Sequence, residues 1–210
     1  MKNIPKIIGI TAIVAVIGVS MLGCATVGAT HGAADTLDLL ATRTTVHANF
    51  IPEPLSQEAI DMLVRAGFTA PTGGNQRSFD LFVVTDRQVM NRMQVNHPYA
   101  GALSTAPLVI VIAADESRAR FPELHEMDTS LAGMSMVVQA TAMGLASCIL
   151  SIAPQQERID SVRAGLSLPE YFMPVMMVAF GYPGPDAIAG ASALVPHNPS
   201  HLHVNAFGRR

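Results

Sequence analysis

The chain has 210 residues, of which 50% are hydrophobic and 14% are charged, and its formal net charge is -3. This length and apolar content fit one folded domain with a substantial core and exclude a disordered chain. The charge balance excludes a broad cationic surface, so nucleic acid is not an expected partner.

The N-terminal segment has the order of an export signal. Lys2 and Lys6 precede an uncharged apolar run over 7–22, which Gly23 and Cys24 follow. The run is shorter than the roughly 20 residues of a spanning helix, so a cleaved signal is expected. Residues 21–24, MLGC, resemble the lipobox of bacterial lipoproteins, which implies lipidation at Cys24. Residues 1–30 are therefore predicted to be a signal and tether that contacts the membrane and places the protein at the cell envelope, lipid-anchored or exported.

Lipidation of Cys24 leaves Cys148 as the one other thiol, which excludes an intramolecular disulfide. Cys148 stands in an apolar run with Ile149 and Leu150. This setting predicts a small buried hydrophobic residue and not a nucleophile.

The first half of the folded part contains two candidate ligand segments. Asp35 is expected to cap a helix that leads into RTTVH at 43–47, where Arg43 offers a guanidinium suited to phosphate. Ser56 is a candidate N-cap for a second helix that Gly67 would end. The stretch 69–82, TAPTGGNQRSFDLF, then joins this helix to a strand over 79–84. Glycines permit close backbone approach to a ligand, but plain turns have the same composition, so both interpretations stay open here.

The middle of the chain predicts a central strand and a long helix. Asp86 is expected to cap a short helix, and the apolar run over 107–114 is typical of a strand covered on both faces. Asp128 is expected to begin a helix that runs to Met143, with Gly144 as its C-cap. Nearly every side of this helix is apolar or small, so burial all round is expected, in a subunit interface or in the core of one chain.

The last part predicts a strand over 147–152, a helix over 155–164 ended by Gly165, and a strand over 174–180. GYPG at 181–184 is expected to break the chain, which gives a domain over 31–185 and a C-terminal tail over 186–210 that is either solvated or wraps a partner subunit. The tail holds His197, His201 and His203, whose spacing does not fit the common metal sites. The sequence contains no GxSxG, Walker A or GxGxxG motif.

Five short motifs, in this order, resemble those of the nitroreductase family of flavin-dependent oxidoreductases. They are RTTVH at 43–47, APTGGN at 70–75, GLASC at 144–148, LSLPE at 166–170 and FGYP at 180–183. The resemblance runs from about Asp35 to Tyr182. It implies an α+β sandwich with a mixed central sheet flanked by helices, in an intertwined homodimer that binds FMN between its subunits. It also implies that the flavin N5 passes two electrons from NAD(P)H to a small-molecule electrophile such as a nitroaromatic or a quinone.

The resemblance further implies roles for residues. Arg43 and Thr45 would hold the FMN phosphate and ribityl chain, Asn75 would approach the isoalloxazine ring, and His47 would lie near its pyrimidine edge. Because the chemistry takes place on the flavin, no catalytic side chain and no metal ligand is expected. The cofactor-binding residues implied are Arg43, Thr44, Thr45, His47, Pro71, Thr72, Gly73, Asn75, Arg77, Gly144 and Ser147.

The chain also departs from the family pattern. His47 stands where Lys or Arg is common, Arg77 where Gln is usual and Phe79 where Trp is usual, and the basic residue that often follows the GYP segment is missing. Two alternatives to the enzyme therefore stay open. One is an envelope flavin electron-transfer module fed by a membrane carrier, and the other is a non-enzymatic binding lipoprotein that has lost flavin.

Overall fold

The computed structural model describes residues 33–185, 187 and 198–209. The export signal and the lipobox, Cys24 included, lie outside these residues and stay predictions, as does any role of His197. Within the described ranges, no helix is long and apolar enough to cross a membrane.

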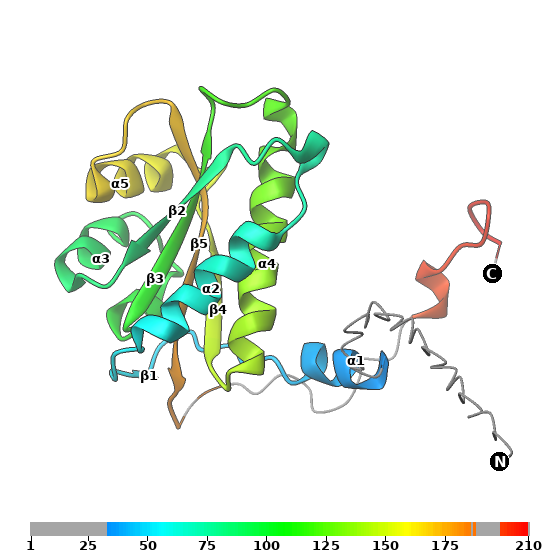
Figure 1. Ribbon diagram of the computed structural model, residues 1–210, viewed down its shortest axis with the longest axis horizontal. Helices are drawn as coiled ribbons and strands as arrows, with labels where there is room; N and C mark the ends of the chain where they lie inside the picture. The colour runs from blue at the N-terminus through cyan, green and yellow to red at the C-terminus, as the bar shows by residue number, and fades with distance from the viewer. Residues whose placement is uncertain (1–32, 186, 188–197, 210) are drawn as a thin grey trace, which may run out of the picture. The chain divides into compact units, whose positions relative to one another are not determined.

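A five-stranded sheet forms the middle layer of the domain (Figure 1). β5 lies at its centre, between β3 on one side and β4 with β1 on the other, and β2 forms the edge beyond β3. All strand pairs are antiparallel, and the parallel component among the described residues is an isolated bridge between Thr45 and Ser147. The strands are β1 (Phe50–Ile51), β2 (Phe79–Val84), β3 (Leu108–Asp115), β4 (Ala146–Ser151) and β5 (Phe172–Pro183).

Helices cover both faces of this sheet, which confirms the predicted α+β sandwich. α2 and α4 pack on one face, and α3 and α5 pack on the other (Figure 1). The helices are α1 (Ala33–Ala41), α2 (Gln57–Thr69), α3 (Arg87–Met93), α4 (His125–Ala142) and α5 (Gln156–Leu166). Short 3₁₀ turns are η1 (Gly73–Asn75), η2 (Ala100–Ser104), η3 (Pro122–Leu124) and η4 (Pro199–His201).

The central strand β3 is buried at every position, as its continuous apolar run predicts. Its side chains alternate between the two faces of the sheet, since successive Cβ atoms of a strand point to opposite sides. Val109 and Val111 join the core under α3 and α5, whereas Ile110 and Ile112 join the core under α2 and α4. The run is continuous because both of its faces are covered.

Two predicted helix caps are confirmed. The Ser56 hydroxyl accepts a hydrogen bond from the Ala59 N–H at 3.2 Å, at the start of α2. The Asp86 carboxylate accepts one from the Gln88 N–H at 2.7 Å, at the start of α3. Each cap provides a partner for a backbone donor that the first helical turn leaves free.

The two glycines expected to end helices are instead packing residues, so those predictions are wrong. Gly67 lies inside α2, where a Cβ would stand 3.0 Å from Cδ1 of Leu81 on the sheet below. Gly165 lies inside α5, where a Cβ would stand 2.8 Å from Cγ of Met93 in α3. Helix α5 ends at Ser167, which adopts a left-handed conformation with φ of 54°.

Other boundaries also differ from the prediction. α1 begins at Ala33 and not at Asp35, and α4 begins at His125, three residues before Asp128. The GYP segment does not break the chain, because β5 continues to Pro183 and pairs with β1, a strand that the sequence did not indicate. Gly181 permits this pairing, since a Cβ there would stand 2.9 Å from the Phe50 ring.

Within one chain, helix α4 is not buried all round, so the alternative of full burial in the core of a single chain is wrong, while burial in a subunit interface stays a prediction. One side packs on the sheet, where Ala132 and Met136 are fully buried. The other side carries Met127, Leu131 and Met134, which are 48%, 38% and 39% exposed. These three residues, the exposed α4 face, form an apolar stripe at helical spacing.

His97 is a buried imidazole that predicts a pH-dependent stability. Its Nε2 donates to the Ser151 carbonyl at 2.8 Å, and its Nδ1 is buried with no hydrogen-bond partner among the residues that the structure describes. Burial lowers its pKa from 6.5, and the nearby Arg158 acts in the same direction, against the Ser151 hydrogen bond. The unfolded chain therefore binds a proton that the folded chain resists, so stability is lost as the pH falls below about 6.5.

We expect the melting temperature to fall by a few degrees between pH 7 and pH 5, at about 2–4 °C per kcal/mol for a chain of this size. In His97→Gln, which keeps a donor close to the position of Nε2, this fall should be smaller. Thermal unfolding followed by circular dichroism across this pH range measures both. Identical pH profiles for the two proteins would show that His97 is not responsible.

Candidate functional site

Two segments about 100 residues apart meet beyond the C-terminal end of α4. The Ser147 N–H donates to the Thr44 carbonyl at 3.0 Å, and the Val46 N–H donates to the Ser147 carbonyl at 3.2 Å. Gly144 has φ of 71°, a left-handed conformation that lets the chain turn from α4 into β4. The predicted RTTVH and GLASC segments are thus held side by side.

Arg43 provides the positive charge of this first cluster. Its Nη1 donates to the Thr45 hydroxyl at 2.6 Å, which holds the side chain against its own segment. Residues 43–47 are called the strap below. Among the described residues, no carboxylate forms an ion pair with Arg43. A half-buried guanidinium with free donors beside a hydroxyl fits an anionic group such as a phosphate.

His47 and Cys148 lie next to the same strap. His47 Nδ1 is 3.9 Å from Cys148 Sγ, and the imidazole is otherwise exposed. Burial raises the pKa of the Cys148 thiol, which keeps it protonated and unreactive near neutral pH. The prediction of a buried, non-nucleophilic cysteine is confirmed in its burial.

The glycine-containing loop over 71–77 forms the second cluster, around the buried carboxylate of Asp128. The Gly73 N–H donates to Asp128 Oδ1 at 2.7 Å, and Gln76 Nε2 donates to Asp128 Oδ2 at 2.9 Å. Gln76 Oε1 in turn accepts from the N–H groups of Arg120 and Phe121, at 3.1 and 3.0 Å. The loop is therefore fixed to the first turn of α4 and to the segment before it.

Asp128 and Gln76 are the structural residues that the sequence did not reveal. Asp128 was expected only to begin the helix, whereas it lies one turn inside and receives hydrogen bonds from residues 52 and 55 positions away. One sequence feature could have indicated this role, namely that Asp128 follows an irregular segment. An acidic residue in the first turn of a helix often accepts hydrogen bonds from free backbone donors. The identity of those donors depends on tertiary contacts.

Three residues of this loop have left-handed backbone conformations. Gly74, Asn75 and Arg77 have φ of 56°, 53° and 49°. A Cβ at Gly74 would stand 2.6 Å from the Phe121 ring, so glycine is required there for two reasons. Thr72 closes the turn, since its hydroxyl accepts from the Arg77 N–H at 3.1 Å. The side chains of Asn75 and Arg77 are left exposed.

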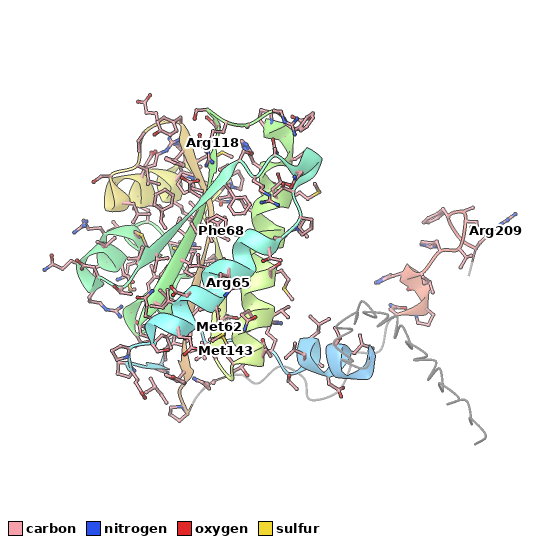
Figure 2. The ribbon with its side chains drawn as sticks, viewed as in Figure 1. Met62, Arg65, Phe68, Arg118, Met143 and Arg209 are labelled. Atoms are coloured by element: carbon pink, nitrogen blue, oxygen red, sulfur yellow. The ribbon has the colours of Figure 1, made fainter. Side chains whose placement is uncertain are left out.

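The structure does not bring the two clusters together within one chain. The loop at 71–77 is tied to Asp128 in the first turn of α4, whereas Thr44 and Ser147 lie beyond its last turn. A helix of 18 residues spans about 27 Å at 1.5 Å per residue. Figure 2 shows the same separation, with Met143 at one end of α4 and Arg118, two residues before the loop's partner Arg120, at the other end of the domain.

A groove of about 540 Å³ runs between α2 and α4. Ser135 and Val138 follow Leu131 at helical spacing, so the groove borders the exposed α4 face. Met62 and Arg65 line it from α2 (Figure 2), and the predicted site residue Pro71 lies at its end. This side of the domain therefore offers a concave, largely apolar surface next to an apolar stripe.

The sequence profile of the nitroreductase family matches residues 40–96 and 91–182, which include both clusters. The chain belongs to the nitroreductase family. The matched region contains the whole sheet apart from the last residue of β5, so family membership and the observed fold agree.

Individual nitroreductase relatives show the same likeness along most of the chain. A protein of Methanothermobacter thermautotrophicus, named as a candidate NADH dehydrogenase/NAD(P)H nitroreductase, is 26% identical over 149 residues, which are 71% of this chain and 78% of that protein. The FMN reductase [NAD(P)H] of Bacillus subtilis is 23% identical over 151 residues, which are 64% of this chain and 61% of that protein. A crystal structure from Bacteroides thetaiotaomicron, also named as a candidate NADH dehydrogenase/NAD(P)H nitroreductase, has a TM-score of 0.75 at 28% identity and covers 84% of this chain and 99% of its own.

Proposed function

We propose that this nitroreductase is an FMN-dependent oxidoreductase that uses NAD(P)H to reduce a small electrophile such as a nitroaromatic or a quinone. The relatives named for NAD(P)H and FMN support the cofactor and the reductant. The Arg43 guanidinium beside Thr45, which forms no ion pair within the part of the chain that the structure describes, supports a phosphate-bearing ligand. When bound, FMN supplies the two-electron chemistry, in which its ring accepts a hydride from the nicotinamide and reduces the second substrate.

The observation that carries this proposal is the position of the two clusters at opposite ends of α4. A second copy placed antiparallel across the exposed α4 face would bring its loop at 71–77 next to the first copy's strap at 43–47. Two-fold symmetry would then create two equal sites, each built by both chains. The stripe of Met127, Leu131 and Met134 gives such a contact an apolar centre.

Within this arrangement the residues divide the work. Arg43 and Thr45 would hold the phosphate and the ribityl chain, and Thr44 and Ser147 fix the strap that carries them. The exposed side chains of the loop, Asn75 above all, would meet the ring from the second copy. The protein thus orients the flavin and limits access to it, and variable surroundings select the electron acceptor.

Absorption spectroscopy of the purified full chain tests the proposal. After incubation with FMN and removal of the excess, we expect flavin absorption bands that NADH or NADPH bleaches without oxygen and that a quinone restores. Bleaching by dithionite alone would replace this proposal with the electron-transfer module. A chain that retains no FMN would replace it with a binding protein that has lost flavin.

A further inference from the structure

The strained part of the loop at 71–77 supports exposed side chains and not the core. Asn75 and Arg77 both have positive φ, a backbone conformation that is strained for a residue other than glycine, although Asn tolerates it better than most. Both side chains are exposed. Strain that supports no packing is typical of residues that contact a ligand.

Within this strained turn, Arg77 contacts Asn75 directly. Arg77 Nε donates to Asn75 Oδ1 at 3.1 Å, while the Arg77 N–H is held by the Thr72 hydroxyl. On the other side of the turn, Arg120 Nη2 donates to the Gly74 carbonyl at 2.6 Å. The backbone on both sides of Asn75 is therefore fixed, and its side chain is fixed by Arg77.

The chemistry of the guanidinium decides which end of the amide faces outward. Arginine has five N–H donors and no acceptor, so only the oxygen of Asn75 can lie against it. The Asn75 Nδ2 amino group then points away from Arg77, and it has no acceptor among the residues that the structure describes. A hydrogen bond from a charged donor to the amide oxygen also strengthens the amide N–H groups as donors.

We propose that Arg77 is a positioning residue that presents the Asn75 amide nitrogen as a hydrogen-bond donor to an acceptor atom of the ligand. This inference rests on the proposed function, in which the ligand is FMN. The acceptors of its isoalloxazine ring are two carbonyl oxygens and the ring nitrogens that carry no proton. The Gln that is usual in place of Arg77 could offer either its oxygen or its nitrogen to Asn75, whereas Arg77 permits one amide orientation.

Two substitutions at Asn75 separate the ligand contact from a purely structural role. Asn75→Asp keeps an oxygen against Arg77 and tolerates the left-handed backbone, but it removes the donor. Asn75→Leu removes the donor without adding charge. We expect both variants to bind FMN about tenfold more weakly, which corresponds to about 1.4 kcal/mol, while Asn75→Asp retains the wild-type melting temperature of the FMN-free protein.

A double-mutant cycle then tests whether Arg77 acts through Asn75. In the wild-type background we expect Arg77→Met to weaken FMN binding about threefold to fivefold. Arg77→Lys, which keeps a charged donor, should bind FMN nearly as tightly as the wild type. In the Asn75→Leu background Arg77→Met should have no further effect on the dissociation constant. Fluorescence titration of the FMN-free full chain with FMN measures all of these constants.

The outcomes decide between three cases. A wild-type chain that does not bind FMN contradicts the proposed function and the inference with it. A wild-type chain that binds FMN while Asn75→Asp binds it equally well contradicts the inference alone. Effects of Asn75→Leu and Arg77→Met that multiply would show that Arg77 contacts the ligand itself, which also contradicts a positioning role.

Discussion

Asp128→Ala is expected to lower the free energy of unfolding by about 2–4 kcal/mol and to weaken FMN binding. The carboxylate is 2% exposed and accepts from the Gly73 N–H and from Gln76 Nε2. Its loss leaves both donors without a charged partner and removes a negative charge from the first turn of α4, where the helix dipole favours it. Thermal and denaturant unfolding measure the first effect, and FMN titration measures the second.

Two further variants make this expectation specific. Asp128→Asn keeps the shape of the side chain but replaces one oxygen with an amino group. Either the Gly73 N–H or Gln76 Nε2 then faces another donor, so we expect a loss of unfolding free energy between zero and that of Asp128→Ala. Gln76 cannot rotate to correct this without giving up its bonds from Arg120 and Phe121. Glu126→Ala removes an exposed acid from the same helical turn and should change stability by less than about 0.5 kcal/mol. Equal effects of Asp128→Ala and Glu126→Ala would contradict the role of the buried carboxylate.

Local patterns predicted those parts of the fold that depend on local interactions. The caps at Ser56 and Asp86 bond to backbone groups two or three residues away, so their partners are set by the chain itself. The run over 107–114 indicates a strand covered on both faces because it contains no polar alternation. These features need no knowledge of which distant segment packs against them.

The wrong predictions concern residues whose role depends on a distant neighbour. Gly67 and Gly165 are of the residue type that most often ends a helix, yet each lies inside its helix, where a neighbouring element approaches closely. β1 has two residues and pairs with the end of β5, so no periodic pattern could indicate it. The exposed α4 face shows the same difficulty, since apolar residues predict burial without stating whether the cover comes from the same chain.

The candidate site was predictable as two motifs but not as a geometry. The resemblance placed Arg43, Thr45, Asn75 and Ser147 in one cofactor site, and the structure holds Arg43, Thr45 and Ser147 together. It places Asn75 at the other end of α4, a distance that only the length and direction of the helix reveal. One chain therefore contains two halves of two different sites, which makes assembly a requirement for binding in our proposal.

This requirement gives the second large effect, expected from Leu131→Arg. Leu131 lies in the middle of the exposed α4 face, between Met127 and Met134, and it belongs to neither the strap at 43–47 nor the loop at 71–77. A guanidinium placed there twice around a two-fold axis would bring two like charges together in an apolar contact. We expect a folded monomer that binds FMN at least 100-fold more weakly than wild type, as measured by sedimentation and by FMN fluorescence.

The matched control is Val95→Arg, which introduces the same charge at an apolar residue that is 71% exposed after α3, on the opposite face of the sheet. This variant should remain a dimer and bind FMN with the wild-type dissociation constant. A Leu131→Arg monomer that still binds FMN tightly would show that one chain completes the site, and a Leu131→Arg dimer with unchanged binding would show that another face forms the interface. Because the substitution leaves every predicted FMN contact in place, a loss of binding that accompanies monomer formation can be attributed to the missing second copy.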